Sequence, residues 1–320
     1  MTKRPSLNLS SSKIIKMLDQ LISRENKIYN FLIVQGDTLS AFCASYVAFN
    51  KGIKVCHLEA GLRSQNLNSP FPEEMYRRLI SKIATLHFCP TRLNYLNLKK
   101  EGIKDNLSII GNSIVDSLNL LKPEIIKNNQ KYNFFFKRNY EFEPLNEKYI
   151  LFTCHRRDNY GKRFEEICNS IKYVAKNFNI KIVYPLHLNP HFYKRAKKNL
   201  EDLTNVILID NQKYLQMLYL IKNSLFIVSD SGGIQEEAPT FNKFVMVIRD
   251  YTERMESIKL GYSKLVEINS KTIISSISKL IENKDYLIKV KKNPYGDGNT
   301  AKLVFKEILK YQKNEENINF

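Results

Sequence analysis

The sequence contains no apolar run as long as the roughly 18 residues that a membrane-spanning helix requires. Its first residues also lack the apolar segment of a secretory signal peptide. With neither signal in the chain, we expect a cytoplasmic protein that does not associate with membranes.

Cysteine is scarce. The 320 residues include five cysteines, an odd number, and no two of them form a CxxC pair. Disulfide frameworks and zinc sites need even numbers or close spacing. We therefore expect isolated core side chains in a reducing compartment, and no bound metal. The five are Cys43, Cys56, Cys89, Cys154 and Cys168.

Arginine-rich arms, zinc fingers and aromatic RNA-binding motifs are absent, although the formal net charge is +18. Such a charge raises nucleic acid as a partner. Here the lysines are spread along the whole chain, which favours a lysine-rich surface, and an anionic small substrate is also consistent with the charge. We expect no nucleic-acid partner.

Short apolar runs alternate with helical patterns along the whole chain. Continuous apolar runs of this length are typical of parallel strands that helices cover on both faces. The pattern predicts an α/β protein with two doubly wound, Rossmann-like parallel-sheet domains. The expected strands are Phe31–Val34, Lys54–Leu58, Leu86–Cys89, Leu107–Ile110, Tyr149–Thr153, Lys181–Pro185, Val206–Ile209, Leu225–Ser229, Phe244–Ile248 and Lys264–Glu267.

The opening strand and glycine-containing turn that are usual in such domains are missing. The chain begins instead with a helix pattern near Ser11 to Ile22. We therefore expect a first domain at residues 1–121 that is incomplete at its N-terminus, short by roughly one βαβ unit. An asparagine-rich linker is expected at 122–148 and a second domain at 149–320, whose last helix is a candidate to cross back.

Acidic residues follow the strands of the first half, at the sheet edge where parallel sheets bind ligands. Asp37 and Glu59 each follow a strand, and Glu73 opens a helix after two prolines. Each has a structural alternative. Asp37 or Thr38 could cap a helix, Arg63 could pair with Glu59, and the helix dipole favours an acid in a first turn.

Phosphate-binding candidates follow the strands of the second half. His155 precedes two arginines between a strand and a helix, where basic donors suit a phosphate. His187 is a weaker candidate in the same domain. The Ser231–Gly233 turn offers backbone N–H groups and a hydroxyl at a helix N-terminus, and Glu237 one turn later could accept from ribose hydroxyls. The alternatives are a structural histidine and an ordinary small turn.

Taken together, these motifs closely resemble the non-hydrolysing UDP-N-acetylglucosamine 2-epimerases. The matching segments occur in the family's order from about Phe31 to Gly298. They are VQGDT, HLEAGLRS, SPFPEEMYRR, LHFCPT, IIGNSIVDSL, CHRRDNYG, IVYPLHLNP, LIDNQKYL, SDSGGIQEEAP, RDYTERMESI and NPYGDG.

The resemblance implies a glycosyltransferase-B fold with UDP in the cleft between the domains. It also implies reversible conversion of UDP-N-acetylglucosamine to UDP-N-acetylmannosamine, a precursor of cell-surface polysaccharide. In the family the C2 proton is removed and UDP is eliminated to give 2-acetamidoglucal, and UDP adds back after reprotonation on the other face. The resemblance implies a UDP-sugar substrate, no metal or redox cofactor, and a homodimer.

The motifs also imply roles for individual residues. Asp37, Glu59 and Glu73 match the family's acid–base carboxylates. His155 matches the histidine that meets the UDP phosphates and assists the leaving group. The implied substrate-binding or UDP-binding residues are Gln212, Ser231, Gly232, Gly233, Glu237, Arg254, His187 and Arg77.

One departure from the family stands at the N-terminus. The family's first strand and its Gly-Thr-Arg-Pro-Glu loop have no counterpart here. We expect low activity from this chain alone, whether through a truncated reading frame or a decayed copy. Two alternatives stay open: a glycosyltransferase of the same fold, and an inactive UDP-sugar-binding relic.

Overall fold

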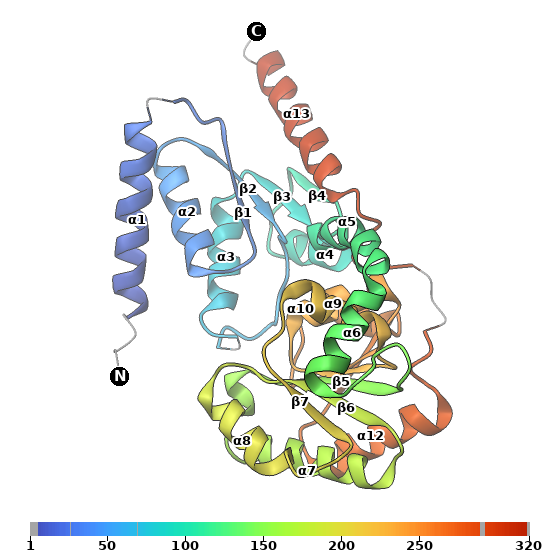
Figure 1. Cartoon of the computed structure of the whole chain (residues 1–320). Coiled ribbons are helices and arrows are strands. Elements are labelled where there is room, and N and C mark those ends of the chain that lie inside the picture. The colour runs from blue at the N-terminus through green and yellow to red at the C-terminus, as the bar shows by residue number, and fades with distance from the viewer. Residues whose placement is uncertain (1–5, 26, 69, 289–291, 319–320) are drawn as a thin grey trace. The chain divides into compact units, whose positions relative to one another are not determined.

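The computed structural model describes residues 6–25, 27–68, 70–288 and 292–318 (Figure 1). Its contacts divide the chain into two compact units. Unit 1 comprises Met1–Asp116 and Tyr295–Phe320, and unit 2 comprises Ser117–Pro294. Within the described ranges, no helix combines the length and the apolar character needed to cross a membrane.

Unit 1 is built on a parallel sheet with the strand order β1-β2-β3-β4. The register pairs Gln35 with Leu58, so the residues that follow β1 and β2 lie at one edge of the sheet. The strands are β1 (Phe31–Gln35), β2 (Lys54–Leu58), β3 (Leu86–Cys89) and β4 (Leu107–Ile109). The helices are α1 (Leu7–Arg24), α2 (Leu39–Asn50), α3 (Glu73–Ile83), α4 (Arg92–Lys100) and α13 (Thr300–Ile318), while α5 (Ser113–Lys127) spans the division between the units.

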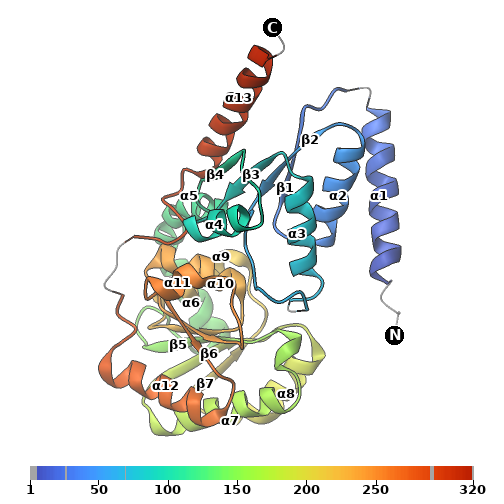
Figure 2. The ribbon, with the colours of Figure 1, turned by 180° about the vertical axis from the view of Figure 1, so that it is seen from behind.

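The last helix, α13, packs against the sheet of unit 1 although it is distant in sequence (Figure 1 and Figure 2). Val304 lies in one buried cluster with Cys56 and Phe88. The Ser108 hydroxyl donates a hydrogen bond to Glu307 Oε2 at 3.0 Å. Parallel strands need apolar cover on both faces, and α13 covers part of one face.

Unit 2 is built on a parallel sheet with the strand order β10-β9-β8-β5-β6-β7. The register pairs Thr153 of β5 with Ser229 of β8, which places the loops after these strands side by side. The strands are β5 (Tyr149–Thr153), β6 (Lys181–Pro185), β7 (Val206–Ile209), β8 (Ile227–Ser229), β9 (Val245–Ile248) and β10 (Ser263–Val266). The helices are α6 (Asn129–Tyr140), α7 (Lys162–Asn177), α8 (Pro190–Leu200), α9 (Tyr214–Asn223), α10 (Gly232–Glu237), α11 (Met255–Lys259) and α12 (Ser270–Asn283), with short 3₁₀ turns η1 (Arg157–Asn159) and η2 (Ala238–Phe241).

One large apolar core stabilises unit 2. Phe152 of β5 and Val228 of β8 pack with Ile171 of α7, Phe192 of α8 and Ile273 of α12. These three helices lie together on one face of the sheet (Figure 2). The packed core holds the strand ends, and the loops that follow them, in fixed positions.

The predicted α/β class with parallel sheets is confirmed, and all ten predicted strands are present with ends that differ by at most two residues. The predicted first helix is confirmed as α1. Residues 122–148, expected to form a linker, include α6. Phe136 in α6 is fully buried and stacks on Tyr219, with ring centroids 6.0 Å apart. The five cysteines are buried and unpaired, as expected.

Candidate active site

Asp37 lies in the turn that follows β1. Its neighbour Thr38 caps α2, because the Thr38 hydroxyl accepts a hydrogen bond from the Ala41 backbone N–H at 3.2 Å. The Asp37 carboxylate instead pairs with Arg77, whose Nη2 lies 2.5 Å from Asp37 Oδ2. Helix capping therefore explains Thr38 and does not explain Asp37.

Arg77 is held between two carboxylates of unit 1. Besides Asp37, it contacts Glu74, with Nη1 2.9 Å from Oε2. Glu74 is fully buried, and the Arg77 side chain is only 4% exposed. The resemblance places Arg77 among the substrate-binding residues. In the structure it pairs with Asp37, and a contact with substrate stays a prediction.

Glu59 follows β2 with a backbone φ of 61°, a left-handed conformation that costs of order 1 kcal/mol. Gln35 Nε2 donates a hydrogen bond to Glu59 Oε1 at 2.5 Å. Arg63, suggested above as the partner of Glu59, forms its ion pair with Glu101, with Nε 2.6 Å from Oε1 and Nη2 2.7 Å from Oε2. Glu59 and Asp37 thus follow neighbouring strands at one edge of the sheet.

The adjacent acids Glu73 and Glu74 begin α3 in different surroundings. Glu74 accepts a hydrogen bond from the Ser64 backbone N–H at 3.0 Å and pairs with both Arg77 and Arg78. In the described part of the chain, Glu73 Oε2 is buried without a hydrogen-bond partner. Such an atom costs about 1–3 kcal/mol. Glu74 is therefore structural, and Glu73 is the acid available to a proton or a ligand.

In unit 2 a buried carboxylate joins two loops of the candidate phosphate site. Asp230, which follows β8, is fully buried. It accepts hydrogen bonds from the backbone N–H groups of His155 at 3.0 Å and Arg156 at 2.8 Å, and from Asn159 Nδ2 at 2.8 Å. His155 Nδ1 lies 3.3 Å from Asp230 Oδ1. The loop after β5 is therefore attached to the turn after β8.

The structure brings His155 and His187 together. Their rings stack with centroids 5.4 Å apart and an interplanar angle of 18°. Burial lowers the pKa of His155 below its ordinary value, the Asp230 carboxylate opposes this effect, and His187 adds to it. The His155 side chain is still 38% exposed, so a ligand can reach the ring.

The Ser231–Gly233 turn lies against the side chain of Arg254. Ser231 caps α10, accepting a hydrogen bond from the Ile234 backbone N–H at 3.4 Å. A Cβ added at Gly232 would lie 2.9 Å from the guanidinium carbon of Arg254. Arg254 pairs with the buried Glu236, with Nη2 2.8 Å from Oε1. Gly232 thus permits a close approach that a side chain would obstruct, and Ser231, Gly232 and Arg254 come together.

Two further predicted UDP-binding residues are Gln212, which lies between β7 and α9, and Glu237, the last residue of α10. The Tyr214 hydroxyl donates to Glu237 Oε1 at 3.0 Å, and burial raises the pKa of Glu237 to about 7 against the effect of this hydrogen bond. Gln212 Nε2 donates to the Asp210 carbonyl oxygen at 2.7 Å. Among the described residues, Gln212 Oε1 is buried without a partner, so it remains an acceptor for a ligand.

Two buried polar residues were missed by prediction from the sequence. Asp230 stands inside the Ser-Asp-Ser-Gly-Gly motif, and its place directly after a strand was the available signal. His57 lies within β2, where its Nε2 is 2.9 Å from the Gly36 carbonyl oxygen. Burial lowers the pKa of His57 to about 3, so the ring is neutral and holds the loop before Asp37.

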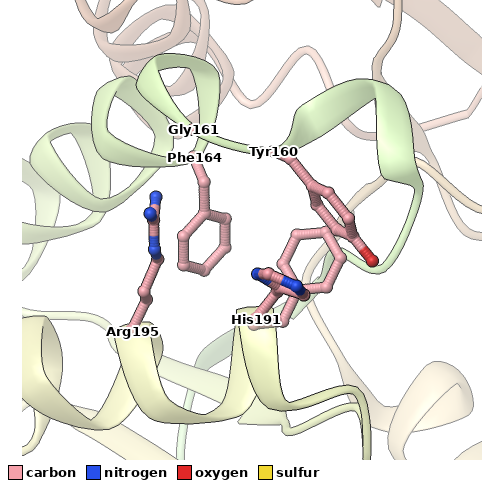
Figure 3. Close-up of a pocket in the computed structure, with 6 residues that line it drawn as sticks. Tyr160, Gly161, Phe164, His191 and Arg195 are labelled. Carbon is pink, nitrogen blue, oxygen red and sulfur yellow. The ribbon is translucent and has the colours of Figure 1, made fainter. Parts of the chain in front are cut away.

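A pocket of about 210 Å³ lies where α7 and α8 begin (Figure 3). Tyr160 and His191 stack at its side with ring centroids 5.0 Å apart. The volume is below the roughly 300–1,000 Å³ of typical small-molecule sites, and none of the predicted site residues lines the pocket. It is not the predicted site. The lining residues are Tyr160, Gly161, Phe164, His191, Phe192 and Arg195.

Comparison with known proteins shows one family. Residues 2–309 match the family model described as UDP-N-acetylglucosamine 2-epimerase. The chain is 41% identical over 294 residues to the UDP-N-acetylglucosamine 2-epimerase of Campylobacter jejuni, covering 89% of this chain and 76% of that protein. It is also 41% identical over 318 residues to the one of Neisseria meningitidis, covering 97% of this chain and 83% of that protein.

Solved structures that are similar to this chain belong to the same family. The crystal structure of the Neisseria meningitidis UDP-GlcNAc 2-epimerase bound to UDP-GlcNAc has a TM-score of 0.87 at 40% identity, covering 97% of this chain and 84% of that chain. The Methanocaldococcus jannaschii UDP-GlcNAc 2-epimerase in complex with UDP-GlcNAc and UDP has a TM-score of 0.80 at 31% identity, covering 96% and 82%. The glycosyltransferase and relic alternatives are not favoured. The chain therefore belongs to the UDP-N-acetylglucosamine 2-epimerase family.

Proposed function

We propose that the chain interconverts UDP-N-acetylglucosamine and UDP-N-acetylmannosamine for cell-surface polysaccharide precursors. The observation that carries this proposal is the attachment of His155 to the buried Asp230, beside the Ser231–Gly233 turn. Basic and backbone donors at this edge of the sheet suit a diphosphate. Family membership and the two UDP-GlcNAc complexes among similar structures support the same substrate.

The reaction needs a base, an acid and a stabilised leaving group. A carboxylate takes the C2 proton, the electron pair of the C–H bond forms the C1–C2 double bond, and the pair of the C1–O bond leaves with UDP. UDP then adds back to C1 while a proton returns to the opposite face of C2. Positioned acid–base groups typically contribute about 10²–10⁴-fold each to the rate.

We assign the proton transfers to the carboxylates of unit 1. Glu73 has a buried oxygen without a partner in the described ranges, which makes it the best candidate to exchange a proton. Asp37 and Glu59, at the ends of neighbouring strands, are the other two acid–base groups. Arg77 orients Asp37 through its 2.5 Å contact.

We assign UDP binding to unit 2. His155 and His187 face the phosphates, with Ser231, Gly232, Gly233 and Arg254 at the turn. Glu237 and Gln212 have acceptor oxygens suited to ribose or uracil groups. No step in this scheme requires a metal or a redox cofactor, and we expect a metal chelator to leave the rate unchanged.

The decisive experiment is incubation of the chain with UDP-N-acetylglucosamine in heavy water. Deuterium should enter at C2, because proton removal and return occur at that carbon. The deuterium label accumulates over hours of incubation, so mass spectrometry detects even slow exchange. Binding of UDP-sugar without C2 exchange would contradict the proposal, and Glu73→Gln supplies the matched control.

We also propose a homodimer, as the resemblance implies, and a cytoplasmic location, as the sequence pattern suggested. Light scattering on the purified chain should then give twice the 37.5 kDa of one chain. A mass of one chain at micromolar concentration would contradict the dimer without affecting the proposed reaction.

A further inference from the structure

Asp230 is fully buried and is surrounded by hydrogen-bond donors from the loop after β5. The backbone N–H groups of His155 and Arg156 and the Asn159 amide all reach Oδ2, and the Cys154 thiol lies 3.3 Å from the same oxygen. A fully buried carboxylate is stable when donors surround it in this way. The donors also fix the orientation of the carboxylate, because two of them belong to the backbone.

The remaining oxygen faces the imidazole ring. With Oδ2 engaged, Oδ1 lies 3.3 Å from His155 Nδ1 and 3.2 Å from the His155 backbone nitrogen. An ionised carboxylate only accepts hydrogen bonds, so a hydrogen bond across this 3.3 Å contact requires the proton on Nδ1. The other ring nitrogen, Nε2, then lies on the side of the ring away from Asp230.

We propose that Asp230 is a positioning residue for the epimerisation, holding the Nδ1–H form of His155 so that Nε2 serves the UDP phosphates. This inference rests on the phosphate-facing role proposed for His155. When the C1–O bond breaks, its electron pair becomes negative charge on the departing phosphate. In the imidazolium form, in which both ring nitrogens carry protons, Nδ1–H stays on Asp230 and Nε2–H donates a hydrogen bond to that oxygen. The proton stays on the ring, and the Asp230 carboxylate balances the imidazolium charge.

Asp230 favours the imidazolium form of His155, whereas the other charged groups around the ring disfavour it. His187 stacks on the ring, and Arg156 and Arg249 also disfavour a second positive charge there. Asp230 acts in the opposite direction. Removal of its charge should therefore leave the ring neutral over a wider pH range.

The test compares Asp230→Asn with wild type and with Cys154→Ala, which removes a different contact to the same carboxylate. We expect Asp230→Asn to lower kcat by about 10²-fold, with a much smaller change in the Kd for UDP. The pH at which activity declines should move downward, because the imidazolium loses its counter-charge. Nitrogen-15 NMR of His155 should show Nδ1–H in wild type and Cys154→Ala, and loss of that form in Asp230→Asn.

The proposal is overturned if wild-type His155 carries its neutral-form proton on Nε2, a result that needs no variant to fold. It is also overturned if Asp230→Asn weakens only folding or UDP binding and leaves the tautomer and the pH profile unchanged. His155→Gln separates the two proposals. If that variant keeps the wild-type rate, the role of His155 fails, whereas the NMR result still decides the contact with Asp230.

Discussion

The guanidinium of Arg77 lies 2.5 Å from the carboxylate of Asp37, and this pair connects the end of β1 to α3. The same guanidinium contacts the buried Glu74 at 2.9 Å. Asp37 keeps 25% of its side chain exposed, whereas Glu74 keeps none. One arginine thus anchors a structural acid and orients a candidate catalytic acid.

Replacement of Arg77 by methionine should therefore be strongly destabilising. It leaves Glu74 buried without its closest cation, a loss that typically costs about 3–5 kcal/mol. Urea unfolding followed by circular dichroism measures the effect. Arg78→Met is the matched control, because Arg78 contacts Glu74 at 3.3 Å but is 36% exposed. Equal losses in the two variants would show that Arg77 has no special place in this network.

Substitutions of the two adjacent acids that begin α3 should have different effects, one on activity and the other on stability. Glu73→Gln should reduce C2 deuterium exchange by about 10²-fold or more, because the side chain loses its ability to exchange a proton. Glu74→Gln should instead lower the free energy of unfolding, since Arg77 and Arg78 lose their shared carboxylate. The reverse pattern, with Glu73→Gln unstable but active, would refute the assignment of Glu73 as an acid–base group.

The two glycines of the Ser-Gly-Gly turn should differ in their tolerance of alanine. A Cβ at Gly232 would lie 2.9 Å from the Arg254 guanidinium, which ion pairs with Glu236 and Glu253 hold in place. We expect Gly232→Ala to cost about 1–3 kcal/mol through this overpacking. At Gly233 the nearest atom would be 3.8 Å away, so its alanine variant should cost less. Unfolding of the ligand-free proteins tests the order.

The titration of Glu237 should lower the free energy of unfolding as pH rises. Its pKa is about 7 in the folded protein, above the ordinary value of 4.5, so the folded state binds the proton more tightly. The stabilisation from this group is present at low pH and is lost as pH rises through the window from 4.5 to about 7. The glutamine of Glu237→Gln cannot titrate. Its free energy of unfolding should therefore rise relative to that of wild type as pH increases across that window.

Tyr214→Phe provides the control for this titration. The Tyr214 hydrogen bond favours the charged form of Glu237, so its removal should raise the pKa further and extend the decline to higher pH. Parallel stability curves for wild type and Glu237→Gln would contradict the prediction.

Much of the fold could be read from local patterns. A parallel strand covered on both faces is apolar along its whole length, and this property appears in a few consecutive residues. For that reason the ten strands were found within two residues of their observed ends. The candidate ligand-binding edge was predicted from the same strands, since ligands of parallel sheets bind where the strands end.

The partners of charged side chains could not be predicted from such local patterns. Arg63 was matched with nearby Glu59, but its ion pair is with Glu101, 38 positions further along the chain. The sequence Glu73-Glu74 does not reveal which acid is paired, because the answer depends on where α3 places Arg77 relative to each carboxylate. Side-chain geometry across elements decides such pairs.

By itself, the sequence determined the α/β class, the strands, the family and the candidate residues, because apolar runs and motif order are properties of neighbouring residues. Only the tertiary structure decided that α13 packs with unit 1 and that Asp230 faces His155. It also decided that, among the residues the structure describes, Glu73 rather than Glu74 has a buried oxygen without a partner. These depend on the register of β5 beside β8 and on helices packed from distant parts of the chain, and no local pattern encodes such distances.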